Sequence, residues 1–312
     1  MGKTWQHLGP IYDKSVNNVP VSSTLKISHA GNSTLIAAGY EFFRDDPEMP
    51  VGNMKTGGVL DDCVVALISK DLGKTWVGPK VVATSFKGPV EASSPVVVLN
   101  DGSWVSPVAN FPDWSGKVED GFYGRLMRSN DQGKTWNDEA ITMEFPGRKV
   151  TVYEQRLCQL QESCNLVVIA WNEDVEEDKL LCNHYALSYY NGRTFCEPMS
   201  TGIMGQASSI TPIGGDKILS LHCIRRNSER PGIYGCVVNL SEGKWEIECE
   251  SMIWEPGMMK KNEKMAEVFS YLRFGQPSAI QLSDRSYLMC HWVIIEDGNG
   301  KILWTKLNIF EL

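Results

Sequence analysis

Two carboxylates and two amides begin equivalent strand-like segments, and the carboxylates could perform acid–base chemistry. Five segments each start with a small or polar residue, continue as an apolar run, turn, and end in a second apolar run, which predicts β-hairpins. Aligning them places Pro20, Glu91, Glu154, Gln206 and Gln276 at matching positions. Glu91 and Glu154 fall on neighbouring units, so they could act as general acid and base, or as nucleophile and acid. Such residues could equally hydrogen-bond to loops or to channel water.

Further side chains near these positions suggest an anionic or sugar ligand. Arg156 is two residues beyond Glu154 and therefore points to the same face of its strand. Guanidinium groups bind carboxylates bidentately, although each Arg could instead be a surface cation or hold a loop. The His residues lack ligand spacing, so we expect no metal and no cofactor. The other candidate substrate-binding residues are Arg44, Trp171, His222, Arg225, Arg226, Arg230 and Arg273.

An eight-residue repeat indicates how these hairpins are arranged. Ser-x-Asp-x-Gly-x-Thr-Trp occurs at 69–76 and 129–136, with a degenerate copy at 188–195 and a weaker one at 239–245. The first three copies are about 60 residues apart, a spacing that indicates a repeat fold. Asp-x-Gly forms a tight turn in which the carboxylate accepts backbone hydrogen bonds, and the aromatic residue packs between sheets. The Asp residues of the motif are therefore predicted to be structural.

This repeat resembles the Asp-box, or BNR repeat, of the sialidase superfamily. The resemblance implies an all-β fold, a β-propeller of four-stranded antiparallel blades with Asp-box turns. We count five blades, whereas the sialidases that the repeat resembles have six. Residues 1–312 are expected to form a single propeller, with the strand-like segments 5–12 and 301–310 closing the ring. Residues 258–270 have helix-forming composition and are expected to lie over the pocket.

The resemblance also implies functional residues. Sialidases bind the substrate carboxylate with three Arg, and use a Tyr–Glu pair as nucleophile and an Asp as acid/base, without a metal. Glu154, in Tyr153-Glu-Gln-Arg, matches the catalytic Glu, and Arg230 resembles a late Arg of the family. Arg44 with Asp46 or its neighbour Asp45 resembles the early Arg and the acid/base loop.

Two positions depart from the family pattern. The N-terminal Arg-Ile-Pro motif appears as Val19-Pro20-Val21, and the last inner strand begins Phe274-Gly-Gln instead of with a Tyr. We therefore predict a sialidase-like glycoside hydrolase that removes a terminal sugar, with acidic sugars among the candidates, by carboxylate chemistry. One alternative is a non-catalytic propeller that binds a carbohydrate or a protein. Another is a uronate-directed polysaccharide lyase on the same scaffold.

Composition limits the partners and the compartment. A net charge of −8 argues against nucleic acid or an anionic membrane as the main partner, but not against a small anionic substrate. The partner we expect is a carbohydrate. Nine Cys without CxxC pairs favour free thiols in a reducing compartment. No signal peptide is visible at the N-terminus and no apolar run is long enough to span a membrane, so we expect a cytoplasmic protein.

Overall fold

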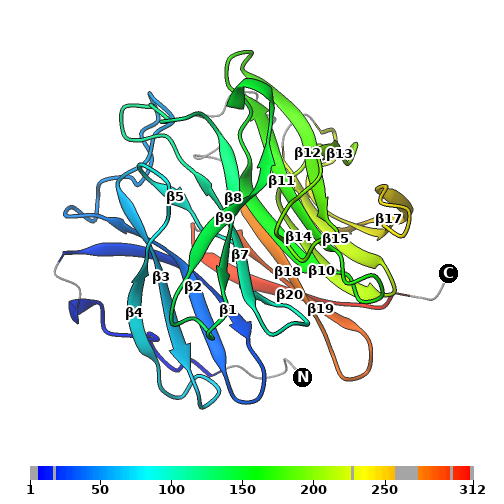
Figure 1. The fold of residues 1–312 in the computed structure, drawn as a ribbon, viewed down its shortest axis with the longest axis horizontal. Coiled ribbons are helices and arrows are strands. Elements are labelled where there is room, and N and C mark those ends of the chain that lie inside the picture. The colour runs from blue at the N-terminus through cyan, green and yellow to red at the C-terminus, as the bar shows by residue number, and fades with distance from the viewer. Residues whose placement is uncertain (1–5, 17–18, 226–227, 257–272, 296–297, 310–312) are drawn as a thin grey trace.

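The chain forms an all-β propeller of five blades, as the repeat predicted (Figure 1). The computed structural model describes residues 6–16, 19–225, 228–256, 273–295 and 298–309. Within each blade the strands are antiparallel and follow one another in chain order from the inner to the outer edge. Two short 3-10 helices, Lys14–Val16 and Pro146–Arg148, lie outside the sheets.

Four blades have a complete set of strands and the fifth has three among the described residues. In the second blade the inner strand is divided into two short pieces that both pair with β7. The strands of the first two blades are β1 (Val21–His29), β2 (Leu35–Phe43), β3 (Asp62–Ser69), β4 (Val77–Val82), β5 (Val90–Glu91), β6 (Val97–Val98), β7 (Trp104–Asn110), β8 (Tyr123–Ser129) and β9 (Asn137–Glu144). Those of the other three are β10 (Tyr153–Gln159), β11 (Leu166–Asp174), β12 (Lys179–Ser188), β13 (Met199–Ser200), β14 (Gln206–Gly214), β15 (Lys217–Ile224), β16 (Gly232–Asn239), β17 (Glu246–Trp254), β18 (Phe274–Gln281), β19 (Tyr287–Ile294) and β20 (Gly300–Leu307).

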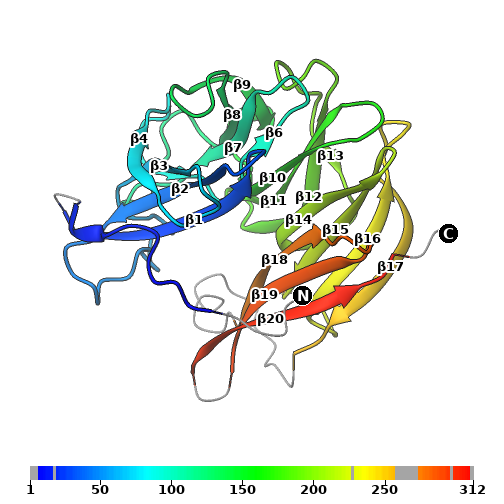
Figure 2. The ribbon, with the colours of Figure 1, turned by 90° about the horizontal axis from the view of Figure 1, so that it is seen from below.

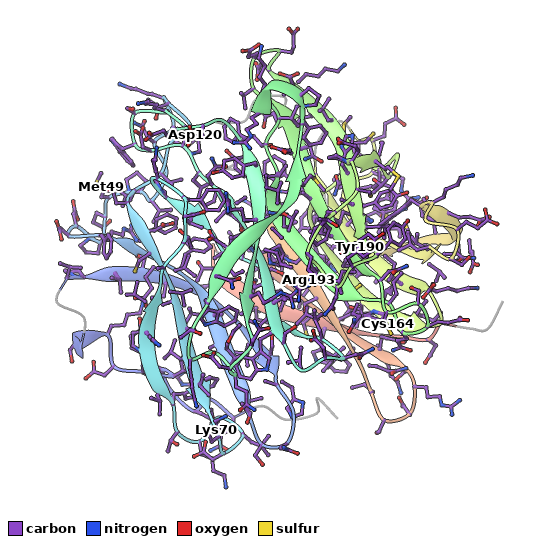
Figure 3. The ribbon with its side chains drawn as sticks, in the orientation of Figure 1. Met49, Lys70, Asp120, Cys164, Tyr190 and Arg193 are labelled. Atoms are coloured by element: carbon purple, nitrogen blue, oxygen red, sulfur yellow. The ribbon has the colours of Figure 1, made fainter. Side chains whose placement is uncertain are left out.

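The repeated motif forms a hydrogen-bonded turn between the third and fourth strands of a blade. In the first copy, Asp71 Oδ1 accepts hydrogen bonds from the Ser69 hydroxyl at 2.8 Å and from Thr75 N at 2.9 Å. Gly73 has φ of 86°, which explains why glycine stands there. The third copy has Tyr190 in place of Asp (Figure 3). It keeps the hydrogen bond from Gly192 N to Ser188 Oγ at 2.8 Å. These bonds occupy the motif carboxylates and agree with a structural role.

Apolar contacts between blades hold the ring together. Four clusters of buried residues join the first blade to the second, the second to the third, the third to the fourth, and the fourth to the fifth. At the remaining seam, apolar side chains stay exposed: Ile27 of the first blade by 54%, and Ile280 and Ile302 of the fifth by 59% and 70%. Among the described residues, the four buried apolar clusters thus span the other seams and not the one between β1 and β18 (Figure 2).

The ends of the chain differ from what the sequence suggested. Residues 6–12 form no strand, so in the described residues the last blade is not completed by the N-terminal segment. Pro10 lies in this segment and has no backbone N–H to give to a sheet. Trp5 and the segment 258–270 lie outside the described residues. No helix in the described part of the chain is long and apolar enough to cross a membrane.

Candidate functional site at the start of the inner strands

The inner strands of three blades share a β-bulge close to their start. In β10, β14 and β18 the pairing register shifts at this point. The bulged residues Glu154, Ala207 and Gln276 have φ of 47°, 49° and 47°, a left-handed backbone that is uncommon for residues other than glycine. Bulges often redirect a side chain beside a functional site. Glu154 and Gln276 are thus equivalent, but Gln206 is one residue out of the predicted register, because Ala207 occupies the matching position.

Glu154 is the centre of a hydrogen-bond network at this mouth. Its Oε2 accepts a hydrogen bond from Trp171 Nε1 at 3.0 Å, and its Oε1 accepts one from Gln276 Nε2 at 3.2 Å. The other end of the amide, Gln276 Oε1, accepts a hydrogen bond from Lys26 Nζ at 2.8 Å. Both carboxylate oxygens therefore have a donor. The network joins the first, third and fifth blades.

Glu91 lies deeper, with 1% of its surface exposed. Burial raises the pKa of Glu91 to about 7, and repulsion from Glu154 acts in the same direction, although Arg156 and hydrogen bonds from Ser93 oppose the rise. The Ser93 N–H donates to Glu91 Oε1 at 3.1 Å. A carboxyl with this pKa exchanges its proton near neutral pH, which is the range that acid–base catalysis requires.

Two groups of the first blade belong to the same electrostatic cluster and were not predicted. Burial raises the pKa of Asp62 to about 8, with a further contribution from the charge of Glu91. Its Oδ1 accepts a hydrogen bond from Val90 N at 2.9 Å, while Oδ2 is buried without a partner. Burial also raises the pKa of Tyr40, and the charges of Glu91 and Glu154 add to this rise. Tyr40 therefore stays a neutral phenol at physiological pH.

Arg156 is the predicted cation that the structure does bring to this cluster. It is 6% exposed, and its Nη1 donates to Ser93 Oγ and to Gln155 O, both at 2.8 Å. Its charge lowers the pKa of Glu91 and also contributes, after burial, to lowering the pKa of Lys26 to about 8. Arg156 and Lys26 thus place two cations behind the carboxylates.

Aromatic rings continue from the carboxylate site across neighbouring blades. Tyr40 and Phe111 lie 6.2 Å apart between ring centroids, Phe111 and Tyr153 5.4 Å, and Tyr153 and Trp171 5.2 Å. Phe122 adds an edge contact to Tyr153 at 6.0 Å. We call these five residues the aromatic rim. The sequence placed Trp171 among the candidate substrate-binding residues, and the structure shows its indole N–H donating to Glu154. Tyr40 and Phe111 lie near the ends of the second strands β2 and β7, whereas Tyr153 begins an inner strand and Phe122 directly precedes a third strand.

The predicted acid/base loop is held by its own hydrogen bonds. Asp46 is exposed, and its Oδ1 accepts a hydrogen bond from Glu48 N at 2.9 Å. Arg44 donates from Nε to Met49 O at 2.6 Å and from Nη1 to Ser22 Oγ at 3.1 Å. Both side chains thus stabilise the loop that follows β2 in the structure, and their catalytic and binding roles remain predictions.

Among the described later arginines, none makes a hydrogen bond or an ion pair with Glu91 or Glu154. Arg230 is exposed and makes an ion pair with Glu255 at 3.2 Å. Arg273 is exposed at the start of β18. Arg225 lies over the ring of Phe274 at 6.0 Å, with a buried Nε that has no partner. Arg226 is outside the described residues. The contacts of Arg230 with Glu255 and of Arg225 with Phe274 could not be predicted from the sequence.

His222 is a buried structural residue and not part of an open substrate site. It is 0% exposed and lies between two hydroxyls, with Ser208 Oγ 2.9 Å from Nδ1 and Ser220 Oγ 2.8 Å from Nε2. Burial lowers the pKa of His222 to about 3. The prediction that it contacts substrate is corrected by this burial. Within the described part of the chain, no three His, Cys, Asp or Glu side chains are grouped to hold a metal ion.

Comparisons with known proteins bear on the fold. No family model and no curated protein matches the chain. Among solved structures, a protein of unknown function from Dyadobacter fermentans is 19% identical with a TM-score of 0.69, and the match covers 92% of this chain and 75% of that one. The Hadza microbial sialidase Hz136 is 14% identical with a TM-score of 0.58, covering 88% of this chain and half of its own. A GH43 β-xylosidase/α-arabinofuranosidase from a compost metagenome is 10% identical with a TM-score of 0.53, covering 96% and 94%. The chain therefore shares its β-propeller fold with a sialidase and with another propeller glycoside hydrolase.

Proposed function

We propose that the protein is a glycoside hydrolase that removes a terminal sugar, and that Glu154 is the carboxylate that contacts this sugar. The observation that carries the proposal is the geometry of Glu154. Its left-handed backbone places it on a bulge, and Trp171 and Gln276 each donate to one of its oxygens. Strain and hydrogen bonding that converge on one acidic side chain are typical of functional sites. The propeller glycosidases with the same fold support this class of reaction.

In the proposed reaction the side chain of Glu154 acts on the anomeric carbon or on the attacking water. Glu91 is the second carboxyl, because its raised pKa allows it to carry a proton near pH 7. The two groups are electrostatically linked, since the charge of Glu154 raises the pKa of Glu91. When Glu154 loses its charge to the sugar or to a proton, Glu91 ionises more readily. The aromatic rim provides faces for stacking a pyranose or furanose ring.

The substrate need not be a sialic acid. Three of the candidate arginines already bond to protein groups: Arg230 pairs with Glu255, Arg44 holds its own loop, and Arg156 donates to Ser93. We therefore include neutral pentoses and hexoses in the substrate class, beside sialic and uronic acids.

A second function is favoured by the burial of Glu91. Because its side chain is 1% exposed, a sugar at this mouth meets one accessible carboxylate and not two. A propeller that binds a glycan without cleaving it needs only hydrogen-bonding groups and an aromatic surface, which Glu154, Gln276 and the aromatic rim provide. Binding without turnover is the outcome that would favour this function.

The experiment is a panel of aryl glycosides and oligosaccharides, with products identified by mass spectrometry. The panel contains neutral terminal sugars, sialic acid and uronic acids, and each compound is tested for binding as well as for cleavage. Release of a terminal sugar supports the glycosidase, and an unsaturated uronate product would indicate the lyase. Binding of a glycan with no product would replace the proposed hydrolase by the binding propeller.

A further inference from the structure

A cavity lies on the propeller axis and runs from Gln276, which is bonded to Glu154, towards the far ends of the inner strands. It has a volume of about 550 Å³, and its walls come from the inner strands of all five blades. These strands all start at the mouth where Glu154 lies, and the cavity is lined by the later residues of each, such as 26–29 of β1 and 156–161 in and after β10. We call this cavity the axial channel. Its volume falls in the range of small-molecule sites.

The charges that line the axial channel are all positive. Lys26 and Arg156 lie at its inner end, and the residues that line it include no Asp or Glu. This is unusual in a protein with a net charge of −8. The carboxylates nearest to this point, Glu154 and Glu91, are not among the lining residues. The amide of Gln276 stands between Lys26 and Glu154.

Polar groups along the channel add hydrogen-bonding capacity. Ser28 Oγ is buried and has no hydrogen-bond partner among the described residues. A buried hydroxyl without a partner costs free energy and is uncommon in folded proteins, so it indicates a missing ligand group or a water. Asn100, Gln159, Ser209 and Ser278 also line the cavity. These groups form the polar part of a lining that also contains apolar residues such as Val97, Ile210 and Ile280.

The carboxylates of Glu91 and Glu154 compensate the two cations only in part. Burial lowers the pKa of Lys26 to about 8, and the charge of Arg156 lowers it further, against smaller opposite effects of Glu154 and Glu91. Among the described residues the guanidinium of Arg156 donates to neutral oxygens, those of Ser93 and of the Gln155 backbone. An anion between the two groups would relieve their repulsion.

We propose that the axial channel binds a small anion carrying a carboxylate or a phosphate group, held by Lys26 and Arg156 and by the hydroxyls around them. This site adjoins the sugar site, because Gln276 lines the channel and also bonds to Glu154, but the proposal does not depend on the proposed hydrolase. Arg and Lys are the side chains that most often bind such oxyanions. The described lining carries Lys26 and Arg156 and no Asp or Glu, which favours anions over cations.

The test is isothermal titration calorimetry of the full chain with sulfate, which has the geometry of phosphate, and with citrate, which carries carboxylates. We expect at least one of the two anions to bind at pH 7. Lys26→Met should weaken the affinity for that anion by about tenfold or more. The matched control is Lys306→Met, which removes the same charge from an exposed ion pair with Asp284. This control should bind as the wild type does.

A second variant keeps the proposal testable if Lys26→Met does not fold. Ser278→Phe adds bulk to an exposed position of the channel lining without changing any charge, and it should abolish binding. A bound anion should raise the pKa of Lys26, so that binding at pH 8 takes up protons from the buffer. The measured heat of binding should therefore differ between buffers of different ionisation enthalpy. Equal affinity in wild type, Lys26→Met and Ser278→Phe would show an adventitious ion only. No heat with either anion would overturn the proposal.

Discussion

The side-chain amide of Gln276 donates a hydrogen bond to the carboxylate of Glu154 over 3.2 Å, although 122 residues separate them in the chain. The carbonyl of the same amide accepts a hydrogen bond from Lys26 at 2.8 Å. This series of bonds crosses the seam between the fifth and first blades, where Ile27 and Ile280 remain exposed. One glutamine therefore both orients the candidate catalytic carboxylate and connects the two ends of the ring.

Replacing Gln276 by Met should reduce catalysis more than stability. The variant removes the donor to Glu154 Oε1 and leaves Lys26 without its acceptor, so we expect kcat to fall about tenfold, as for loss of one hydrogen bond to a charged group. The control is Gln281→Met, at an exposed position of the same strand. Steady-state kinetics of both variants measure the effect, and an equal kcat in wild type and Gln276→Met would contradict the positioning role.

Replacing Trp171 by Phe tests the second donor to Glu154. The change keeps an aromatic ring beside Tyr153 but removes the indole N–H that reaches Oε2 at 3.0 Å. We expect kcat to fall about tenfold with a smaller change in KM, because the stacking face remains. If Trp171 acted only in stacking, KM alone would rise. The ratio of the two kinetic constants distinguishes these roles.

Glu91 should make the protein less stable as pH rises through the neutral range. Its pKa is about 7 in the folded state and 4.5 ordinarily, so between these values the folded state binds more protons than the unfolded state. Stability is therefore lost on going from pH 4.5 to pH 7, by up to about 3 kcal/mol. Asp62, with a pKa of about 8, acts in the same direction over a wider range.

The measurement is urea unfolding of wild type and Glu91→Gln at pH 5 and pH 7.5. Relative to wild type, the free energy of unfolding of Glu91→Gln should be higher at pH 7.5 than at pH 5. Glu176→Gln, which changes an exposed ion pair with Lys149, is the matched control and should show no such shift. A constant difference between wild type and Glu91→Gln would show that Glu91 does not hold its proton in the folded state.

His222→Leu should destabilise the fold and leave substrate binding intact. The variant removes the His222 hydrogen bonds of Ser220 and Ser208, although Ser208 Oγ still accepts one from Asn183 Nδ2 at 2.7 Å, and the loss costs about 1–3 kcal/mol. In wild type the pKa of about 3 also means that stability contributed by neutral His222 is lost as pH falls from 6.5 towards 3. Urea unfolding at pH 7 and pH 5 checks both effects. A raised KM with unchanged stability would restore His222 to the substrate site.

The fold was predictable because its repeat carries local signals. Ser69, Asp71 and Gly73 form a turn whose hydrogen bonds lie within one short segment, so the residue types alone indicate it. The apolar hairpins between successive turns then gave the count of five blades. The closing segment was less predictable, because residues 6–12 form no strand and the third strand of the last blade, Gly300–Leu307, ends that sheet in the described residues.

The site was predictable only in part. Glu154 and Gln276 could be identified because both begin an inner strand, and Glu91 because its hairpin is similar. A bulge moves Ala207 into the position expected for Gln206, and such a one-residue shift leaves no mark in the hydrophobic pattern. Lys26 and Asp62 were missed because their role depends on residues of other blades, which come close only when the ring forms.

The most direct measurement is turnover of the best substrate of the panel by Glu154→Gln and Glu154→Ala. The account predicts a loss of at least about 10³-fold in kcat for both variants, with binding retained, as expected when a catalytic carboxylate is removed. Glu144→Gln, at an exposed ion pair with Arg148, should keep wild-type turnover. Added azide should restore activity to Glu154→Ala with formation of a glycosyl azide. Turnover by Glu154→Gln within a few-fold of wild type would contradict the assignment of Glu154 as the residue that acts on the sugar.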